Sequence, residues 1–388
     1  MEKSENSNNV SMIKKFIPIL IGIIVVFFLI IIVAAGAKSC SKPSNNYKGT
    51  QSKMVSAAKK YYKSHGDELP GKGESKTITA TELAEKGEMK PLSKYLKDTS
   101  CEGKVNVYNN GGKYLLVPDL VCAEYKTKHL IDAIKEDSLV DTNTISNDAT
   151  TAPANSKVSI GKDYVSGLYL ENGVYVFKGK NPNNYFTMGG LKWRILSIEA
   201  DGTIRLLKVN QEKRNSYWDT KYNTDANRSY GINDYKNSKI LEKMNSEYEK
   251  FKDENKTHLA PHSVCIGRRS ATTISKDRSI DCSEVLTNQY IGLPSISDYA
   301  NASLDENCLN ITDGSCSNYN YLTEILVESW TATGLADNTY SVYFVNGGIA
   351  MYDEARKALP YNWVIAIKGD ELYASGNGTS EKPYTINK

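Results

Sequence analysis

The sequence predicts an α+β fold dominated by antiparallel strands and carried on an N-terminal transmembrane helix. Short apolar runs recur on both sides of Asn-Gly and Asp-Gly dipeptides, which is typical of β-hairpins. A few other segments repeat apolar residues every three or four positions, as amphipathic helices do. A long uncharged stretch near the N-terminus is the third observation.

The first exterior element is a small module at residues 47–130. Residues 47–64 are expected to form a helix, because five apolar residues recur on one face: Met54, Ala57, Ala58, Tyr61 and Tyr62. A shorter helix should follow, since Thr79 and Glu82 have the spacing of a capping box and Gly87 suits its end.

A hairpin is predicted next, with strands at 105–108 and 114–117 and its turn centred at 110–111. This register brings Cys101 within two residues of Cys122 on the facing strand. A bridge between them would stabilise so small a core by roughly 3 kcal/mol in the chain-entropy model.

Residues 131–156 turn to Asp, Asn, Thr, Ser and Ala and predict a polar linker. The β-rich ectodomain at 157–388 then contains four predicted hairpins, whose strands are 168–170 with 174–177, 193–198 with 204–207, 341–345 with 349–352, and 363–367 with 372–373. One helix interrupts them. Asn233 or Asp234 is its expected cap, and its apolar side carries Ile240, Leu241, Met244, Tyr248 and Phe251.

The segment Phe16–Ala37 carries no charge and is long enough to cross a bilayer as a helix. A cleaved signal peptide is the alternative, but its apolar region would be only about 7–15 residues long. We therefore expect an uncleaved anchor that contacts lipid through 16–37, with residues 1–15 as a cytoplasmic tail. Lysines flank both ends, so the charge distribution alone hardly decides the orientation.

The cysteines decide the orientation. Six of the seven fall into three couples that are close in sequence: Cys101 with Cys122, Cys265 with Cys282, and Cys308 with Cys316. Such couples are typical of structural disulfides in an oxidising compartment, although six cysteines allow 15 pairings. We therefore expect a single-pass cell-membrane protein with its N-terminus inside and its domains outside. Cys40 is the odd one, and Lys38 beside it argues against a lipoprotein signal.

Residues 54–127 resemble the small globular part of type IV pilin-like surface proteins of Gram-positive bacteria. The resemblance rests on five stretches, at 54–62, 69–70, 85–87, 101–105 and Cys122. True prepilins carry a small residue before the cleavage point and a glutamate at the fifth position of the apolar run. Here Lys15 precedes Phe16 and Leu20 stands at the glutamate position, so we interpret the segment as a pilin-like module on an ordinary anchor.

The ectodomain resembles an uncharacterised family of bacterial surface domains. The matching stretches are 193–196, 233–235, 262–267, 291–293, 302–308, 316–322, 330–331, 375–379 and 383–384. The order of elements is similar to that of C-type-lectin-like folds, which implies ligand binding on a loop-rich face. The Glu-Pro-Asn and Gln-Pro-Asp signatures of calcium-dependent lectins are absent from the sequence, so that activity does not carry over.

No residue is predicted to be catalytic, to bind a metal or to hold a cofactor. His258, His262 and Cys265 superficially offer metal ligands, but Pro261 disfavours the helix that would align the histidines, and Cys282 is the preferred partner of the thiol. The histidines at 65 and 129 have no identifiable free thiol nearby for nucleophilic catalysis.

Three acidic residues, Asp305, Glu306 and Asp313, could in principle coordinate calcium. They lack the spacing of a calcium-binding loop and are interpreted as solvated loop residues. The neighbouring stretch 318–321 is interpreted as a packed corner rather than a displayed surface.

A net charge of +3 and the absence of a dense basic face exclude a nucleic-acid partner. The sequence favours a membrane-anchored surface protein whose ectodomain binds an unknown extracellular protein or glycan, with no catalysis inferred. One alternative is a pilin-like or pseudopilin structural subunit. A second is an extracellular enzyme on a fold like that of the formylglycine-generating enzymes, which requires a reduced cysteine pair.

Overall fold

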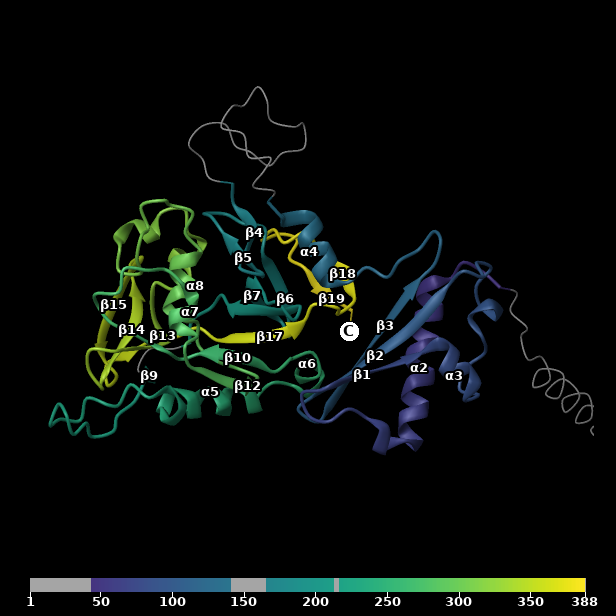
Figure 1. Ribbon diagram of the computed structural model, residues 1–388, viewed down its shortest axis with the longest axis horizontal. Helices are drawn as coiled ribbons and strands as arrows, with labels where there is room; N and C mark the ends of the chain where they lie inside the picture. Colours follow the sequence, from purple (N-terminus) through teal and green to yellow (C-terminus); the bar gives the residue numbers. More distant parts are fainter. Residues whose placement is uncertain (1–42, 141–164, 213–215, 388) are drawn as a thin grey trace, which may run out of the picture.

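The computed structural model describes residues 43–140, 165–212 and 216–387. Across these residues the chain has the predicted α+β class, with antiparallel sheets making up most of the body. Figure 1 shows a small part, which holds the first helices and strands, beside a larger part that holds the remaining sheets.

The predicted transmembrane segment at 16–37 lies outside the described residues. Among the described helices, none combines the length and the apolar character that a membrane crossing requires.

The small module packs helices α2 (Tyr47–Ser64) and α3 (Ala80–Glu85) on a three-stranded antiparallel sheet. The strands follow the order β1 (Ser75–Thr79), β2 (Glu102–Asn110) and β3 (Lys113–Val121). Helix α2 has the predicted bounds, and all five residues of its predicted apolar face are buried. The predicted capping box at the start of α3 is also present.

The turn of the β2–β3 hairpin differs from the prediction by one residue. It lies at Gly111-Gly112, whose φ angles of 69° and 90° only glycine adopts at little cost. The later turn shifts the pairing by two residues, so that Glu102 faces Val121. Cys101 and Cys122 therefore meet at the base of the hairpin and form the predicted disulfide.

A six-stranded antiparallel sheet organises the larger domain. Its order is β17–β8–β7–β5–β4, with β6 also pairing to β7. The strands are β4 (Gly167–Glu171), β5 (Val174–Lys178), β6 (Tyr185–Met188), β7 (Leu191–Ile198), β8 (Thr203–Lys208) and β17 (Val364–Lys368).

A second sheet has the order β11–β13–β14–β15, in which only β11 and β13 run parallel. Its strands are β11 (Arg268–Arg269), β13 (Glu328–Leu335), β14 (Ser341–Asn346) and β15 (Ile349–Glu354). Three two-stranded ribbons complete the domain: β10 (His262–Cys265) with β12 (Val285–Gln289), β9 (Ser216–Tyr217) with β16 (Ala358–Leu359), and β18 (Tyr373–Ser375) with β19 (Thr385–Ile386).

Three of the four hairpins predicted in this domain are confirmed, namely β4–β5, β7–β8 and β14–β15. The fourth prediction is wrong, because β17 pairs with β8 and β18 pairs with β19. Residues 364–367 are almost completely buried. Such an apolar run suits a strand that is covered on both faces, and β17 reaches that environment by pairing with β8.

The predicted helix in this domain is α5 (Lys239–Glu249), and its cap is Ser238 rather than Asn233 or Asp234. Asp234 instead caps a single 3₁₀ turn just before it. The predicted cap is therefore wrong, because the turn at Tyr235–Asn237 and the helix are separate elements. The remaining short helices are α6 (Asp253–Lys256), α7 (Arg278–Asp281) and α8 (Ile296–Asn301).

The expected linker at 131–156 differs from the structure at its start, where helix α4 (Leu130–Ser138) forms. Its residues Leu130, Ala133 and Ile134 join the hydrophobic core of the larger domain. The polar composition of the segment conceals this helical spacing. In Figure 1, α4 lies beside the β18–β19 ribbon, on the larger part of the molecule.

Polar contacts join the two parts. The Tyr108 hydroxyl donates to Asp370, and the side-chain amide of Asn110 donates to the Thr257 carbonyl at 2.8 Å. Lys113 pairs with Asp253 at 3.0 Å. The β2–β3 hairpin tip therefore docks onto the larger domain.

Candidate functional site

A cavity of about 690 Å³ opens beside the six-stranded sheet of the larger domain. Its lining residues come from strands β4, β5, β7, β8, β10 and β12, from helices α7 and α8, and from the segments next to them. The disulfide Cys265–Cys282, which the sequence predicts, ties β10 to the end of α7 and forms part of the wall. This size falls within the range of about 300–1,000 Å³ that is usual for small-molecule sites.

A bidentate ion pair crosses the cavity wall between β8 and α8. Both terminal nitrogens of Arg205 donate to the carboxylate of Asp298, each at 2.8 Å. Arg205 is only 4% exposed and lies in β8 between the apolar residues Ile204 and Leu206. Asp298 is fixed a second time by a capping box with Ser295 at the start of α8.

The charges continue along the wall beyond Arg205. Glu199 follows β7 and lies 3.7 Å from Arg205 Nη1, and it accepts a 3.0 Å hydrogen bond from Arg278 on α7. The Ser197 hydroxyl also donates to Glu199 at 2.6 Å. Asp298, Arg205, Glu199 and Arg278 therefore form a chain of alternating charge.

The acids of this chain remain ionised. Burial alone would raise the pKa of the Asp298 carboxyl, but the Arg205 guanidinium more than offsets burial and holds that pKa well below its usual range. Burial opposes ionisation of Glu199 as well, and Arg205 and Arg278 together lower its pKa. Two carboxylates then face two guanidiniums, and the chain as a whole is neutral.

His262 lies on β10 and also lines the cavity. The residue is 8% exposed, both ring nitrogens are buried, and the backbone of Ala260 and of Gln289 lies beside the ring. Burial, followed by the nearby charge of Arg205, lowers its pKa to about 3. The ring is therefore neutral at physiological pH and keeps one N–H donor and one acceptor nitrogen.

Several buried polar atoms of the cavity wall lack a partner within the described residues. They are Thr203 Oγ1, Arg205 Nε and Arg278 Nε, and each has less than 1 Å² of accessible surface. The surrounding protein covers these atoms, so they do not face the cavity. The cavity is the candidate site because of its size and the chain of charged residues along its wall.

A second buried ion pair holds α7 and α8 in place behind the cavity. Arg269 Nε donates to Asp281 Oδ1 at 2.5 Å, and both side chains are fully buried. The other carboxylate oxygen of Asp281 accepts the backbone N–H of Ser297 at 2.9 Å. Asp281 thereby links the end of α7 to the first turn of α8.

The residues that the sequence singles out for metal binding are separated in the structure. His258 hydrogen-bonds Glu371 at 2.8 Å, whereas His262 faces the cavity and Cys265 is bonded to Cys282. One group of potential ligands occurs among the described residues, and it combines Asp98 with Cys101 and Cys122. Because those two sulfurs form a disulfide, they offer no thiolate to a metal.

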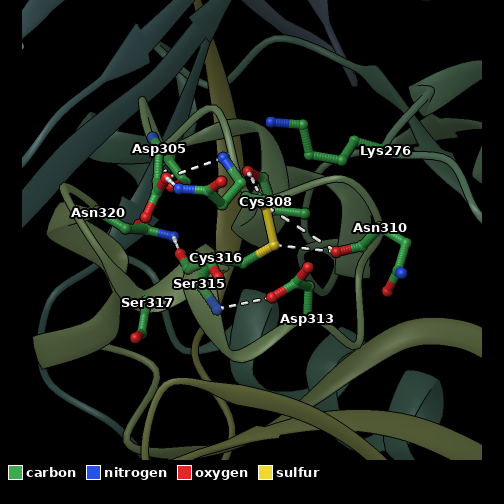
Figure 2. Close-up of a disulfide and its surroundings, with 12 residues drawn as sticks. Lys276, Asp305, Cys308, Asn310, Asp313, Ser315, Cys316, Ser317 and Asn320 are labelled. Carbon is green, nitrogen blue, oxygen red and sulfur yellow. Dashed lines mark hydrogen bonds between the residues drawn. A yellow bond between two sulfur atoms is a disulfide. The ribbon is translucent and has the colours of Figure 1, made fainter.

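The carboxylates of Asp305 and Asp313 accept hydrogen bonds from nearby loop residues and do not converge on a common metal site. Figure 2 shows Asp305 and Asp313 on opposite sides of the disulfide Cys308–Cys316. The prediction of solvated acids is wrong for Asp305, which is 6% exposed because it accepts from Asn307 and Asn318. Glu306 is exposed, and the partly exposed Asp313 accepts from the backbone N–H of Ser315.

The second half of the corner predicted at 318–321 packs inward, whereas Asn318 is exposed. Asn320 is 4% exposed and donates to two backbone carbonyls, those of Tyr299 and Cys316, at 2.8 Å each. Tyr321 is buried and reaches the cavity wall.

The sequence interpretation missed Arg205, Asp298 and Glu199. One signal was available, because Ile204-Arg205-Leu206-Leu207 places a charge inside an otherwise apolar strand. A charge in such a strand is expected to be paired. Its partner Asp298 is 93 residues away in sequence, and no local pattern points to it.

Comparisons of the chain with protein-family models, with curated proteins and with solved structures found no match.

Proposed function

We propose that this chain is a membrane-anchored cell-surface protein that binds a small extracellular ligand in the cavity beside Arg205 and His262. The observation that carries the proposal is a ligand-sized cavity whose wall holds a chain of alternating charges, Asp298, Arg205, Glu199 and Arg278. No acid, base or nucleophile is assigned to catalysis.

Two features support a location outside the cytoplasm. The uncharged segment 16–37 has the composition of a membrane anchor. The six cysteines of the described ranges all form disulfides, which persist in oxidising compartments. The pilin-like module at 47–130 then separates the cavity from the bilayer, and a loop-rich C-type-lectin-like face would present it to an extracellular protein or glycan.

The test uses the full chain, purified in detergent, against arrays of glycans, host-matrix proteins and cell-wall fragments. A blocking variant, Ala200→Trp, places an indole at an exposed position on the cavity rim. Ala123→Trp is the matched control, because Ala123 is equally exposed but lies on the small module. We expect saturable binding to one class of compound, lost in the first variant and kept in the second.

Two outcomes contradict the proposal. One is the absence of saturable binding to every compound of the arrays. The other is binding that Ala200→Trp leaves unchanged, since the ligand would then occupy another surface.

The two alternative functions, a pilin-like subunit and an extracellular enzyme, require other properties of the chain. A pilin-like structural subunit requires removal of the N-terminal leader, which the intact mass of membrane-extracted protein reveals. The enzyme alternative requires a reduced cysteine pair, and every cysteine within the described ranges is bonded to another. No feature of the described residues favours either interpretation.

A further inference from the structure

Helix α2 of the small module carries five lysines and no acidic residue over its 18 residues. The lysines are Lys48, Lys53, Lys59, Lys60 and Lys63. All five are exposed, and they lie within an arc of about 140° around the helix axis. We call this set the lysine face of α2. Because its members are spread over 16 positions of the sequence, they form one basic surface only once the helix has formed.

The opposite side of α2 packs against the small module, so the helix presents the lysine face to solvent. Met54, Ala58 and Tyr61 are each 2% exposed or less, and β2, β3 and α3 are the main packing partners of the helix. Figure 1 shows α2 on the side of the small part that lies away from the larger domain. Lys60 pairs with Glu88 at 2.8 Å, whereas the other four lysines form no ion pair within the described ranges.

The charge of the whole chain is divided in the same sense. Residues 1–130 contain 20 lysines and no arginine, against 12 acidic residues. Residues 131–388 contain 28 basic and 33 acidic residues. The formal net charge of +3 therefore combines a basic part of +8, which includes the expected anchor, with an acidic part of −5 beyond it.

The lysine face is also close to the expected membrane. Nine residues, 38–46, separate the apolar segment 16–37 from the start of α2. Even a fully extended connection of this length spans at most about 35 Å. Helix α2 therefore begins within that distance of the bilayer, a step that rests on the membrane anchor of the proposed function.

We infer that the lysine face docks on the anionic lipid headgroups of the membrane that holds the anchor. Lysine ammonium groups act as point charges, which suits a fluid surface of phosphate groups, whereas recognition of one fixed phosphate commonly uses the bidentate guanidinium of arginine. Each lysine near an anionic bilayer favours the docked state by about fivefold. Docking fixes the small module on the bilayer and directs the acidic larger domain, with its cavity, away from it.

Lysine footprinting of the full chain in vesicles tests the inference. The chain is reconstituted into vesicles of neutral phosphatidylcholine and into vesicles that also contain anionic phosphatidylglycerol, and a membrane-impermeant acylating reagent is added outside. We expect the lysines of α2 to react about fivefold more slowly in the anionic vesicles. Lys180 and Lys382, which are exposed on the larger domain, should react equally in both. High salt should remove the protection, because it screens exposed charges.

Two matched variants separate docking from mere proximity to the bilayer. Lys59→Gln/Lys63→Gln removes two charges of the lysine face and should weaken docking by about 25-fold, so that Lys53 reacts almost as fast in anionic as in neutral vesicles. Lys192→Gln/Lys239→Gln removes the same charge from exposed positions of the larger domain and should leave the protection unchanged.

Three results overturn the inference while the anchor stands. One is equal labelling of α2 in both kinds of vesicle. Another is protection that survives in Lys59→Gln/Lys63→Gln, since proximity would then suffice. The third is protection that appears only when soluble inorganic polyphosphate is added, because the face would then bind a dissolved polyanion.

Failure of the proposed function has a different signature. A chain without an anchor is released from both kinds of vesicle by alkaline carbonate, which overturns the anchor and this inference together. Cavity binding is measured separately through Ala200→Trp, and its loss or retention does not depend on the lysines of α2.

Discussion

Ion pairs with both side chains buried occur in the larger part of this molecule, and none occurs among the described residues of the small module. In the small module, Lys76 pairs with Glu68 at 3.7 Å while both side chains stay at least 40% exposed. In the larger domain, the side chains of Arg205 and Asp298 are 5% and 7% exposed, and those of Arg269 and Asp281 are fully buried. Burying such pairs is costly and rarely adds stability over apolar packing.

This difference fits the proposed function, in which the small module acts as a spacer and the larger domain holds the ligand cavity. Of the two buried pairs, Arg205 and Asp298 line that cavity.

Breaking the buried ion pair should be far more damaging than breaking the exposed one. Arg205→Met leaves the Asp298 carboxylate buried without its partner, and we expect a loss of about 3–5 kcal/mol in the free energy of unfolding. Lys76→Met removes an exposed partner and should change it by at most about 1 kcal/mol. Urea unfolding of the full chain measures both.

The double variant Arg205→Met/Asp298→Leu is the control, because it removes both charges together. It should recover a large part of the stability lost in the single variant. Equal losses in Arg205→Met and Lys76→Met would contradict the contrast between the two parts.

The disulfide at the hairpin base should matter most to the small module. Replacing Cys101 and Cys122 by Ala should destabilise this module by about 3 kcal/mol, and the shorter loop of Cys308–Cys316 should contribute about 2.5 kcal/mol to the larger domain.

All four tryptophans lie in the larger domain, so their fluorescence reports that domain alone. In the Cys101/Cys122 variant, hydrogen exchange should accelerate in β1–β3 while the tryptophan transition stays close to that of the native chain. A large shift of the tryptophan transition would show that the two parts unfold as one unit.

The docking of the hairpin tip should contribute a smaller amount. Tyr108→Phe removes the hydroxyl that donates to Asp370, which we expect to cost about 1.5 kcal/mol. Tyr114→Phe is the control, since its hydroxyl bonds only Asn109 of the same hairpin among the described contacts. Faster exchange at the β18–β19 ribbon in the first variant alone would confirm the contact.

The smallest effect concerns pH. His129 lies between the Asp370 carbonyl at 2.6 Å and Asp119 at 3.5 Å, and His258 bonds Glu371. Burial opposes protonation of both rings, but the partners outweigh it and raise each pKa above the ordinary value of 6.5.

The sign of the pH effect follows from these raised pKa values. The folded chain binds these protons more tightly than the unfolded chain, so their contribution is complete below pH 6.5 and is lost as the pH rises through the folded pKa. Stability should therefore fall from pH 6.5 upward, and His129→Gln should flatten that fall. An unchanged slope in the variant would assign the pH dependence to other groups.

Local patterns predicted much of the fold. The helix at 47–64, the capping box at Thr79 and three hairpins of the larger domain follow from spacing within a few residues. The predictions failed where an element is determined by contacts with residues that are distant in sequence. Strand β17 pairs with β8, more than 150 residues earlier, and α4 is stabilised by a core that its own polar composition does not reveal.

The candidate site was beyond local reasoning for the same reason. The three disulfides were predicted because their partners are close in sequence. Arg205, His262 and Asp298 instead come from three separate elements, and their proximity is a product of the tertiary fold. Only the charge inside an apolar strand could have indicated it.

Ligand binding to intact cells tests the central claim most directly. Cells that display the native chain should bind the labelled compound identified by the arrays in a saturable way, and cells that display equal amounts of Ala200→Trp should not. Equal binding by both cell types would contradict the assignment of the cavity as the ligand site. Absence of binding by the native chain, together with its resistance to protease added outside the cells, would contradict the surface location as well.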